Sequence, residues 1–199
     1  MAVRIQYLGD IMTVTIAKVP THLAAGLHRT IWVPAKNGIA DIHKPTVAEL
    51  EKAGNIDLSI YLGSHDAFNL DHSQETFNDE REAYAVAGKI NGMEKYENGK
   101  LHVIDNTNTK DAEQYNEAIK ALTKGARGFF VRRRGKKVTE EFTAGDVVSV
   151  FPATIGLRTA FKDNRQMSLI NFAADPSSSD EESVVVASEA APGVSSTSH

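Results

Sequence analysis

Runs of alternating apolar and polar residues constrain the fold of this chain more than any other feature. The clearest is residues 56–62 (IDLSIYL), in which every second residue is apolar. Because successive side chains of a strand point to opposite faces, this period of two predicts a strand with one buried face. Further runs rich in β-branched or aromatic residues lie at residues 12–18, 27–33, 101–104, 128–133, 146–151 and 166–172. Together they predict a mainly β fold.

Two helices are expected beside the strands. Residues 110–124 carry a single apolar stripe, with acids in the first turn and lysines in the last, and Gly125 follows as a terminator. The stripe consists of Ala112, Tyr115, Ile119 and Leu122. A stripe this narrow is typical of a helix that lies against a sheet. A shorter helix is predicted over residues 47–52, because Thr46 and Glu49 have the spacing of a capping box.

A tight hairpin is predicted at residues 97–100 (ENGK). Asn98 and Gly99 tolerate the positive φ angles that a two-residue type I′ turn requires. Residues 101–104 are then the returning strand, and residues 34–55 are interpreted as a connector between strands.

The composition changes abruptly at residue 176. From there to residue 199 the chain is rich in serine and carries four acids but no lysine or arginine. Such a segment buries too little apolar surface to offset its ordering entropy. We therefore expect one domain over residues 1–175, with an N-terminal arm, followed by a flexible acidic tail over residues 176–199. The run Val184-Val185-Val186 leaves a second interpretation open, in which it adds as a strand to the sheet of a neighbour.

Several classes of protein are disfavoured by what the sequence lacks. There is no cysteine, no run of 18 apolar residues and no charged-then-apolar leader, so we expect neither disulfides nor a membrane-spanning or secreted chain. None of the motifs GxSxG, GxxxxGK[ST], HExxH or GxGxxG is present. We therefore expect no catalytic residues, no cofactor and no metal. His65, Asp66, Asp71 and His72 lie close in sequence but match no ligand spacing, and we interpret them as polar loop residues.

Charge is segregated along the chain. Residues 57–82 contain seven acids and one arginine, whereas residues 124–137 contain seven bases and no acid. Complementary patches steer association and fix its register, so these blocks could bind other copies of the chain. The alternative is that both blocks are solvated faces. The candidate residues for this contact are Arg132, Arg133, Arg134, Lys136, Lys137, Asp71, Glu75, Asp79, Glu80 and Glu82.

The basic stretch GFFVRRRGKK (residues 128–137) also suggests a nucleic-acid-binding module using residues 127–137. In a strand, however, Phe129, Val131 and Arg133 share one face, and the three residues that alternate with them share the other. The cations then form no single stripe. A charged edge or hairpin tip is the favoured interpretation, with nucleic-acid binding as the alternative.

Several longer segments resemble a known family. They are TIWVPAKNGIADIHKPTVAELEKAGNIDLSIYL, FNLDHSQETFNDEREA, ALTKGARGFFVRRRGK, AGDVVSVFPATIGLRTAF and NRQMSLINFA. Together, over roughly residues 25–173, they resemble the major tail tube proteins of long-tailed, siphovirus-type bacteriophages that infect actinobacteria.

This resemblance implies a β-sandwich or barrel-like fold of two packed antiparallel sheets, flanked by the helix over residues 110–124. It also implies a structural, non-enzymatic virion protein. Copies would form hexameric rings that stack into a hollow tube, which conducts DNA into the host. The implied partners are other copies, a tape-measure protein in the lumen, and tail-tip and terminator proteins at the ends. DNA would pass without specific binding and no membrane is involved. The implied location is the virion tail, with assembly in the host cytoplasm.

Overall fold

Strands dominate the computed structural model, which describes residues 3–7, 10–14, 26–64, 67–79, 88–162 and 166–188. The mainly β class is confirmed. The strands are β1 (Val3–Tyr7), β2 (Asp10–Val14), β3 (His28–Pro34), β4 (Ile56–Asp57), β5 (Phe68–Asp79), β6 (Gly88–Ile104), β7 (Arg127–Arg134), β8 (Val147–Lys162), β9 (Gln166–Ala174) and β10 (Asp180–Val184). The helices are α1 (Val47–Leu50), α2 (Glu117–Ala121) and the 3-10 helix η1 (Pro176–Ser178).

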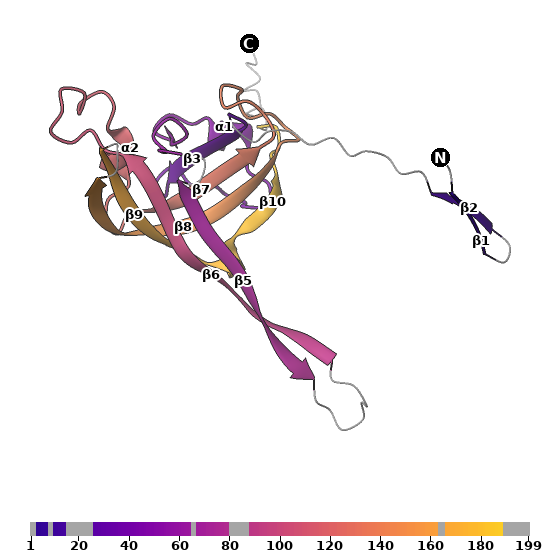
Figure 1. Cartoon of the computed structure of the whole chain (residues 1–199). Coiled ribbons are helices and arrows are strands. Elements are labelled where there is room, and N and C mark those ends of the chain that lie inside the picture. Colours follow the sequence, from indigo (N-terminus) through magenta and orange to yellow (C-terminus); the bar gives the residue numbers. More distant parts are fainter. Residues whose placement is uncertain are drawn as a thin grey trace, which may run out of the picture.

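One antiparallel sheet of eight strands forms the body, and β1 pairs with β2 separately. The order in the body is β4-β3-β7-β8-β9-β6-β5, with β10 also paired to β8. We expected two packed sheets, but the strands form one continuous sheet that curls on itself (Figure 1). The long strand β8 explains the difference. It pairs with β7 through residues 148–154 and with β9 through residues 153–162, and its register shifts between Ile155 and Arg158, which bends a strand.

The link between β4 and β5 closes the barrel-like body. Leu58 donates its N–H to the carbonyl of Thr30 on β3, at 2.8 Å. A few residues later, Gly63 donates to the carbonyl of His102 on β6, and Ile104 of β6 donates to the carbonyl of Tyr61. The link therefore hydrogen-bonds to β3 near one end of the sheet and to β6 near the other end.

The two faces of the sheet bury two separate cores. The inner core is aromatic and contains Trp32, Phe130 and Phe68, with Ile119 of α2 packed into it. The outer core, on the other face, contains Ile31, Val33, Val131, Val148 and Val150, covered by Leu50 of α1, Phe142 and Val185. The alternation predicted for residues 128–133 is therefore confirmed, because Phe130 and Val131 enter different cores.

Two local predictions were wrong because tertiary contacts reassigned the segments. Only Ile56–Asp57 form a strand, since Asp57 accepts a hydrogen bond from the Ser59 N–H, and Leu58 starts a turn. The turn predicted at Asn98-Gly99 is a bulge within β6. Asn98 does have a positive φ of 54°, but Glu97 pairs with Asp71 and Lys100 with Asn69, so β6 continues through both residues.

The long helix predicted over residues 110–124 shrinks to α2 (Glu117–Ala121). Asparagine side chains hold the preceding residues in turns. Asn116 accepts from the Asn106 N–H at 3.1 Å, and Asn106 in turn donates its side-chain amide to the Tyr115 carbonyl at 2.9 Å. The apolar stripe is kept only where the sheet covers it, because Ile119 is buried while Tyr115 is 48% exposed. The short helix α1 ends two residues before the predicted boundary, and its capping box is present.

The folded body extends past the predicted boundary at residue 175. Strand β10 pairs with β8, so the valine run adds to the sheet of its own chain. Val185 is 1% exposed in the outer core, and Val186 bridges to Thr46 beside α1. A single well-buried valine thus anchors a segment whose composition alone predicted a flexible tail. Residues 189–199 lie outside the described residues.

Truncation of Val185 tests this anchoring. We expect Val185→Ala to lower the free energy of unfolding by about 2 kcal/mol, because it removes two buried methyl groups and leaves a cavity. Val184→Ala is the matched control, since the adjacent Val184 is 46% exposed. Urea unfolding followed by circular dichroism measures both variants. Equal, small effects would contradict the packing of this segment onto its own chain.

Candidate assembly surfaces

Arg133 lies inside the fold and not on the surface. Its side chain points to the outer-core face of β7 and is 1% exposed. The guanidinium forms an ion pair with Asp146 at 3.1 Å and lies over the ring of Phe142. It also donates to the carbonyls of Lys137, Glu140 and Glu141 at 2.7–2.9 Å. Arg133 therefore fixes the loop between β7 and β8, and in this structure it has no surface to offer to another copy.

Asp146 is the buried counterion at the centre of this loop. Burial by itself raises the pKa of this carboxyl, but hydrogen bonds from Lys136, from the Thr143 N–H and from Arg133 outweigh it and lower the pKa to about 2. Lys136 is thus occupied by Asp146 and by the Thr143 hydroxyl at 3.0 Å. Lys137 is exposed at the tip of the same loop.

Arg132 and Arg134 point to the inner-core face of β7, where the aromatic core ends. The Arg132 guanidinium lies 4.2 Å over the Phe68 ring, and its Nε donates to the Thr30 hydroxyl at 3.3 Å. Arg134 is exposed and approaches the Ser149 hydroxyl at 3.4 Å. Both line a pocket of about 300 Å³ between β5, β7, β8 and β10. Arg132 and Arg134 therefore lie on the opposite face of β7 from Arg133, although the three residues are consecutive in the sequence.

The predicted acidic contacts lie on β5. Asp71 and Glu75 are exposed and Asp79 is half-buried, whereas Glu80 and Glu82 lie outside the described residues. Asp71 accepts from the Asn98 side chain at 2.8 Å, and Glu75 lies 3.7 Å from Lys95, which also pairs with Glu97. The opposing strand thus supplies part of the countercharge.

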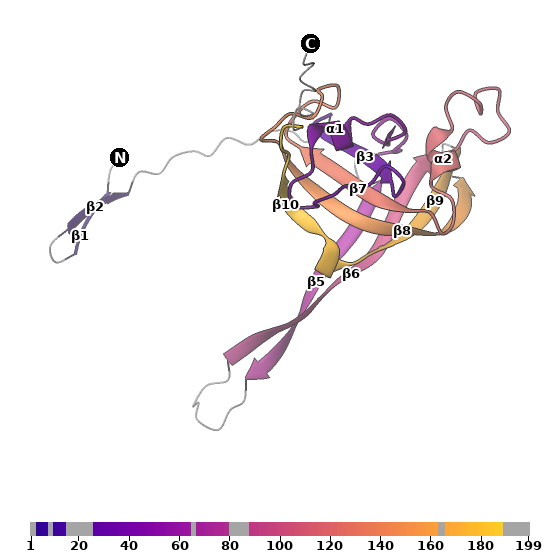
Figure 2. The same ribbon diagram turned by 180° about the vertical axis from the view of Figure 1, so that it is seen from behind.

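The far part of the β5–β6 pair, residues 73–79 and 88–95, forms what we call the distal ribbon. Figures 1 and 2 both show it projecting away from the body. Phe77 pairs with Ile90 across the two strands, and the two side chains are 57% and 50% exposed. Met93 is 76% exposed. Large apolar side chains on a projecting ribbon mark a surface for binding another protein chain. Single-sequence patterns missed this surface because segment 63–88 reads as polar.

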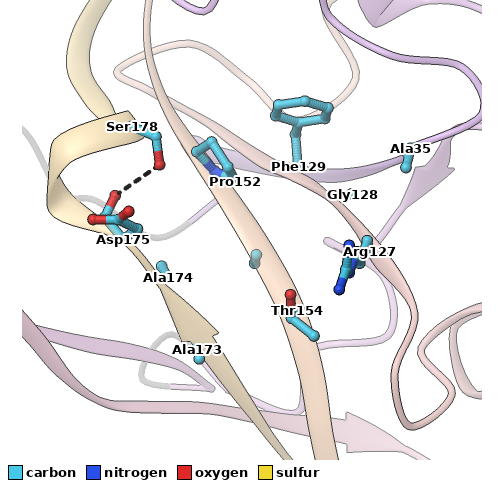
Figure 3. Close-up of a pocket in the computed structure, with 11 residues that line it drawn as sticks. Ala35, Arg127, Gly128, Phe129, Pro152, Thr154, Ala173, Ala174, Asp175 and Ser178 are labelled. Atoms are coloured by element: carbon cyan, nitrogen blue, oxygen red, sulfur yellow. Dashed lines mark hydrogen bonds between the residues drawn. The ribbon is translucent and has the colours of Figure 1, made fainter.

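A second pocket, of about 440 Å³, lies at the opposite end of β7 (Figure 3). Its walls are largely small or apolar residues from the ends of β7, β8 and β9, and Figure 3 shows Phe129 and Pro152 between Asp175 and Arg127. Arg127 and Asp175 are the two charged residues of its lining. This lining holds no set of acid, base and nucleophile that a catalytic site requires.

The described part of the chain holds no group of three or more His, Asp or Glu residues arranged to bind a metal ion. His65 and Asp66, half of the cluster considered from the sequence, lie outside it. Among the described helices none has the length and apolar character needed to cross a membrane.

A mainly β body with exposed apolar side chains on a projecting ribbon is typical of a protein that binds other protein chains. The family model for phage tail tube proteins matches residues 16–188. The chain therefore belongs to the phage tail tube protein family. Comparison with curated proteins finds no significant match.

Stability at acid pH tests the Asp146 network. The folded-state pKa of about 2 lies below the usual value of 3.8 for an aspartate, so this carboxylate stabilises the fold by about 2 kcal/mol above pH 4. We expect that stabilisation to be lost as the pH falls from about 4 to 2. Asp146→Asn should remove this pH dependence and cost about 3 kcal/mol at neutral pH, because it leaves Arg133 buried without a counterion. Asp111→Asn, at an exposed carboxylate, is the control. Urea unfolding across this pH range measures the stability of both variants. If both variants showed the same pH dependence, the stabilising role of Asp146 would be contradicted.

Proposed function

We propose that this protein is the subunit of a phage tail tube and that it assembles into stacked rings, hexameric as the family resemblance implies. The tube conducts DNA into the host cell. Membership of the tail tube family carries the proposal, and the exposed apolar residues of the distal ribbon support it. The tape-measure protein in the lumen, the tail-tip and terminator proteins at the ends, location in the virion tail and assembly in the host cytoplasm follow from the same family.

The distal ribbon is the surface best suited to join copies. An isolated two-stranded ribbon is marginally stable in water, and exposed strand edges invite pairing. Phe77 and Ile90 contribute to neither core of the body and remain about half exposed, so they are available to a neighbouring chain. Contact with a neighbouring copy covers these side chains and orders the ribbon.

Complementary charge supports head-to-tail stacking, but fewer residues are available for it than the sequence predicted. Arg133 and Lys136 are held by Asp146. The surface contacts proposed to another copy therefore fall to Lys137 on the basic side and to Asp71, Glu75 and Asp79 on the acidic side, whereas Arg132 and Arg134 line a pocket of their own. Glu80 and Glu82 stay predictions. A contact that joins two different surfaces propagates into a ring or filament.

Removing the apolar side chains of the ribbon tests the proposal. We expect Phe77→Ser with Ile90→Ser to abolish rings and tubes while changing monomer stability by about 0.5 kcal/mol or less, because both side chains are already exposed. Thr76→Ser with Asn91→Ser, at an exposed pair facing away from them, is the control. Negative-stain microscopy of concentrated protein reads out assembly. Wild-type protein that stays monomeric even with a tape-measure partner would contradict the function. Tubes formed by the Phe77/Ile90 variant would contradict only the role of the ribbon.

The soluble monomer should not bind DNA. The cations of residues 127–137 are divided between several places: Arg133 and Lys136 bind Asp146, Arg132 and Arg134 line a pocket, Lys137 lies at the loop tip, and Arg127 lies at the far end of β7. A gel-shift series at low and moderate salt should show no retardation of duplex DNA. Retardation that weakens steeply with salt would instead support the nucleic-acid-binding alternative.

A further inference from the structure

Two neighbouring arginines converge on one pocket without a carboxylate between them. Arg132 and Arg134 point to the same face of β7, and both line the pocket at the end of the inner core. Among the described residues neither guanidinium forms an ion pair, whereas Arg29 and Arg133 each bind a carboxylate within 3.1 Å. The protein thus pairs Arg29 and Arg133, which are half-buried and buried, with carboxylates, and leaves the half-buried Arg132 and the exposed Arg134 without one.

Leaving this pair open has an energetic cost. Burial beside Phe68 and repulsion from Arg134 lower the pKa of Arg132 to about 10, so it still carries its charge at neutral pH. Two like charges at the edge of an aromatic core destabilise the isolated chain. Such an arrangement is typical of a site that binds an anionic group and trades stability for function.

The acid that lines the pocket does not neutralise the two arginines. Glu181 of β10 lines the same pocket, but its carboxylate binds His72 at 3.2 Å and the Tyr96 hydroxyl at 3.0 Å. His28, His72 and Tyr96 are the other titratable groups in the lining. At neutral pH the arginines therefore outnumber the single carboxylate, which already has partners of its own.

We propose that the pocket between Arg132 and Arg134 is a receptor for a carboxylate of a second copy of this chain. The inference rests on the proposed function, because it names a contact between tube subunits. Guanidinium groups bind planar carboxylates through paired N–H donors. A pocket of about 300 Å³ recessed between strands has the size for one acidic side chain.

The loop before α2 is the segment best placed to supply this carboxylate. Asp111 and Glu113 are exposed there and have no ion pair among the described residues. Figures 1 and 2 place α2 and β10 on opposite sides of the body. The acidic loop adjoins α2, whereas Glu181 of β10 lines the arginine pocket, so the loop and the pocket belong to different surfaces of one subunit. A contact between them joins unlike surfaces, and such contacts repeat from copy to copy.

Opposite effects on stability and assembly test this receptor. We expect Arg134→Gln to leave the monomer at least as stable as wild type, because it removes a repelling neighbour, and to raise the protein concentration needed for tube formation about tenfold or more. Arg127→Gln, at an exposed arginine on the same strand, is the control and should assemble normally. A purely structural role predicts lower monomer stability and unchanged assembly. Either that result or normal assembly of Arg134→Gln would overturn the proposal.

A second experiment tests the partner surface. Asp111→Asn with Glu113→Gln should assemble as poorly as Arg134→Gln. Mixing the two variants restores one intact contact per pair, so analytical ultracentrifugation should detect dimers that neither variant forms alone. Normal tubes from the Asp111/Glu113 variant would show that this loop does not supply the carboxylate.

A measurement on the monomer separates failure of this inference from failure of the proposed function. Sodium acetate in place of sodium chloride, at equal ionic strength, should raise the melting temperature of wild type but not of Arg134→Gln. No difference between the two salts would overturn the receptor even if the protein forms tubes. Stabilisation by inorganic phosphate with no effect of acetate would identify a free oxyanion in place of a neighbour's carboxylate and would also overturn it.

Discussion

The packing of Phe68 against three other strands is the interaction on which the rest of the structure depends. Its ring lies 5.3–6.1 Å from those of Phe130 on β7, Phe151 on β8 and Phe172 on β9. These contacts hold β5, at one end of the strand order, over the middle of the sheet, so a single sheet can enclose a core. Each such aromatic pair is worth about 0.5–1.5 kcal/mol beyond the area it buries. The curl also fixes where β5 and β6 leave the body, and hence where the distal ribbon projects.

Curling the sheet gives β7 two unlike faces, and this determines the fate of the basic run. On the outer face, Arg133 is buried and serves the loop that precedes β8. On the inner face, Arg132 and Arg134 lie where aromatic packing stops and a pocket begins. The run thus combines a structural arginine with two that face an open pocket. Charge alone does not separate these roles, but the alternation of the strand does.

Local patterns predicted the mainly β class, the division of β7 into two faces and the capping box of α1, because each depends on residues close in sequence. Patterns failed where distant contacts decide. The helix expected over residues 110–124 yields to the asparagine network of Asn106 and Asn116. Asn98 has the predicted positive φ but lies in a bulge, since β6 pairs with β5 both before and after it. Val185 holds an acidic segment on the body by packing into the outer core, which exists only once the sheet has folded. The exposed pair Phe77 and Ile90 became visible only when both strands of the ribbon were placed.

The central claim is that the uncovered surfaces of this subunit are completed by copies of itself. Cryo-electron microscopy of the assembled protein tests it most directly. We expect a hollow tube in which the distal ribbon of each subunit is covered by a neighbouring copy. A tube in which the ribbon stays exposed to solvent, or particles that never progress beyond monomers, would contradict it.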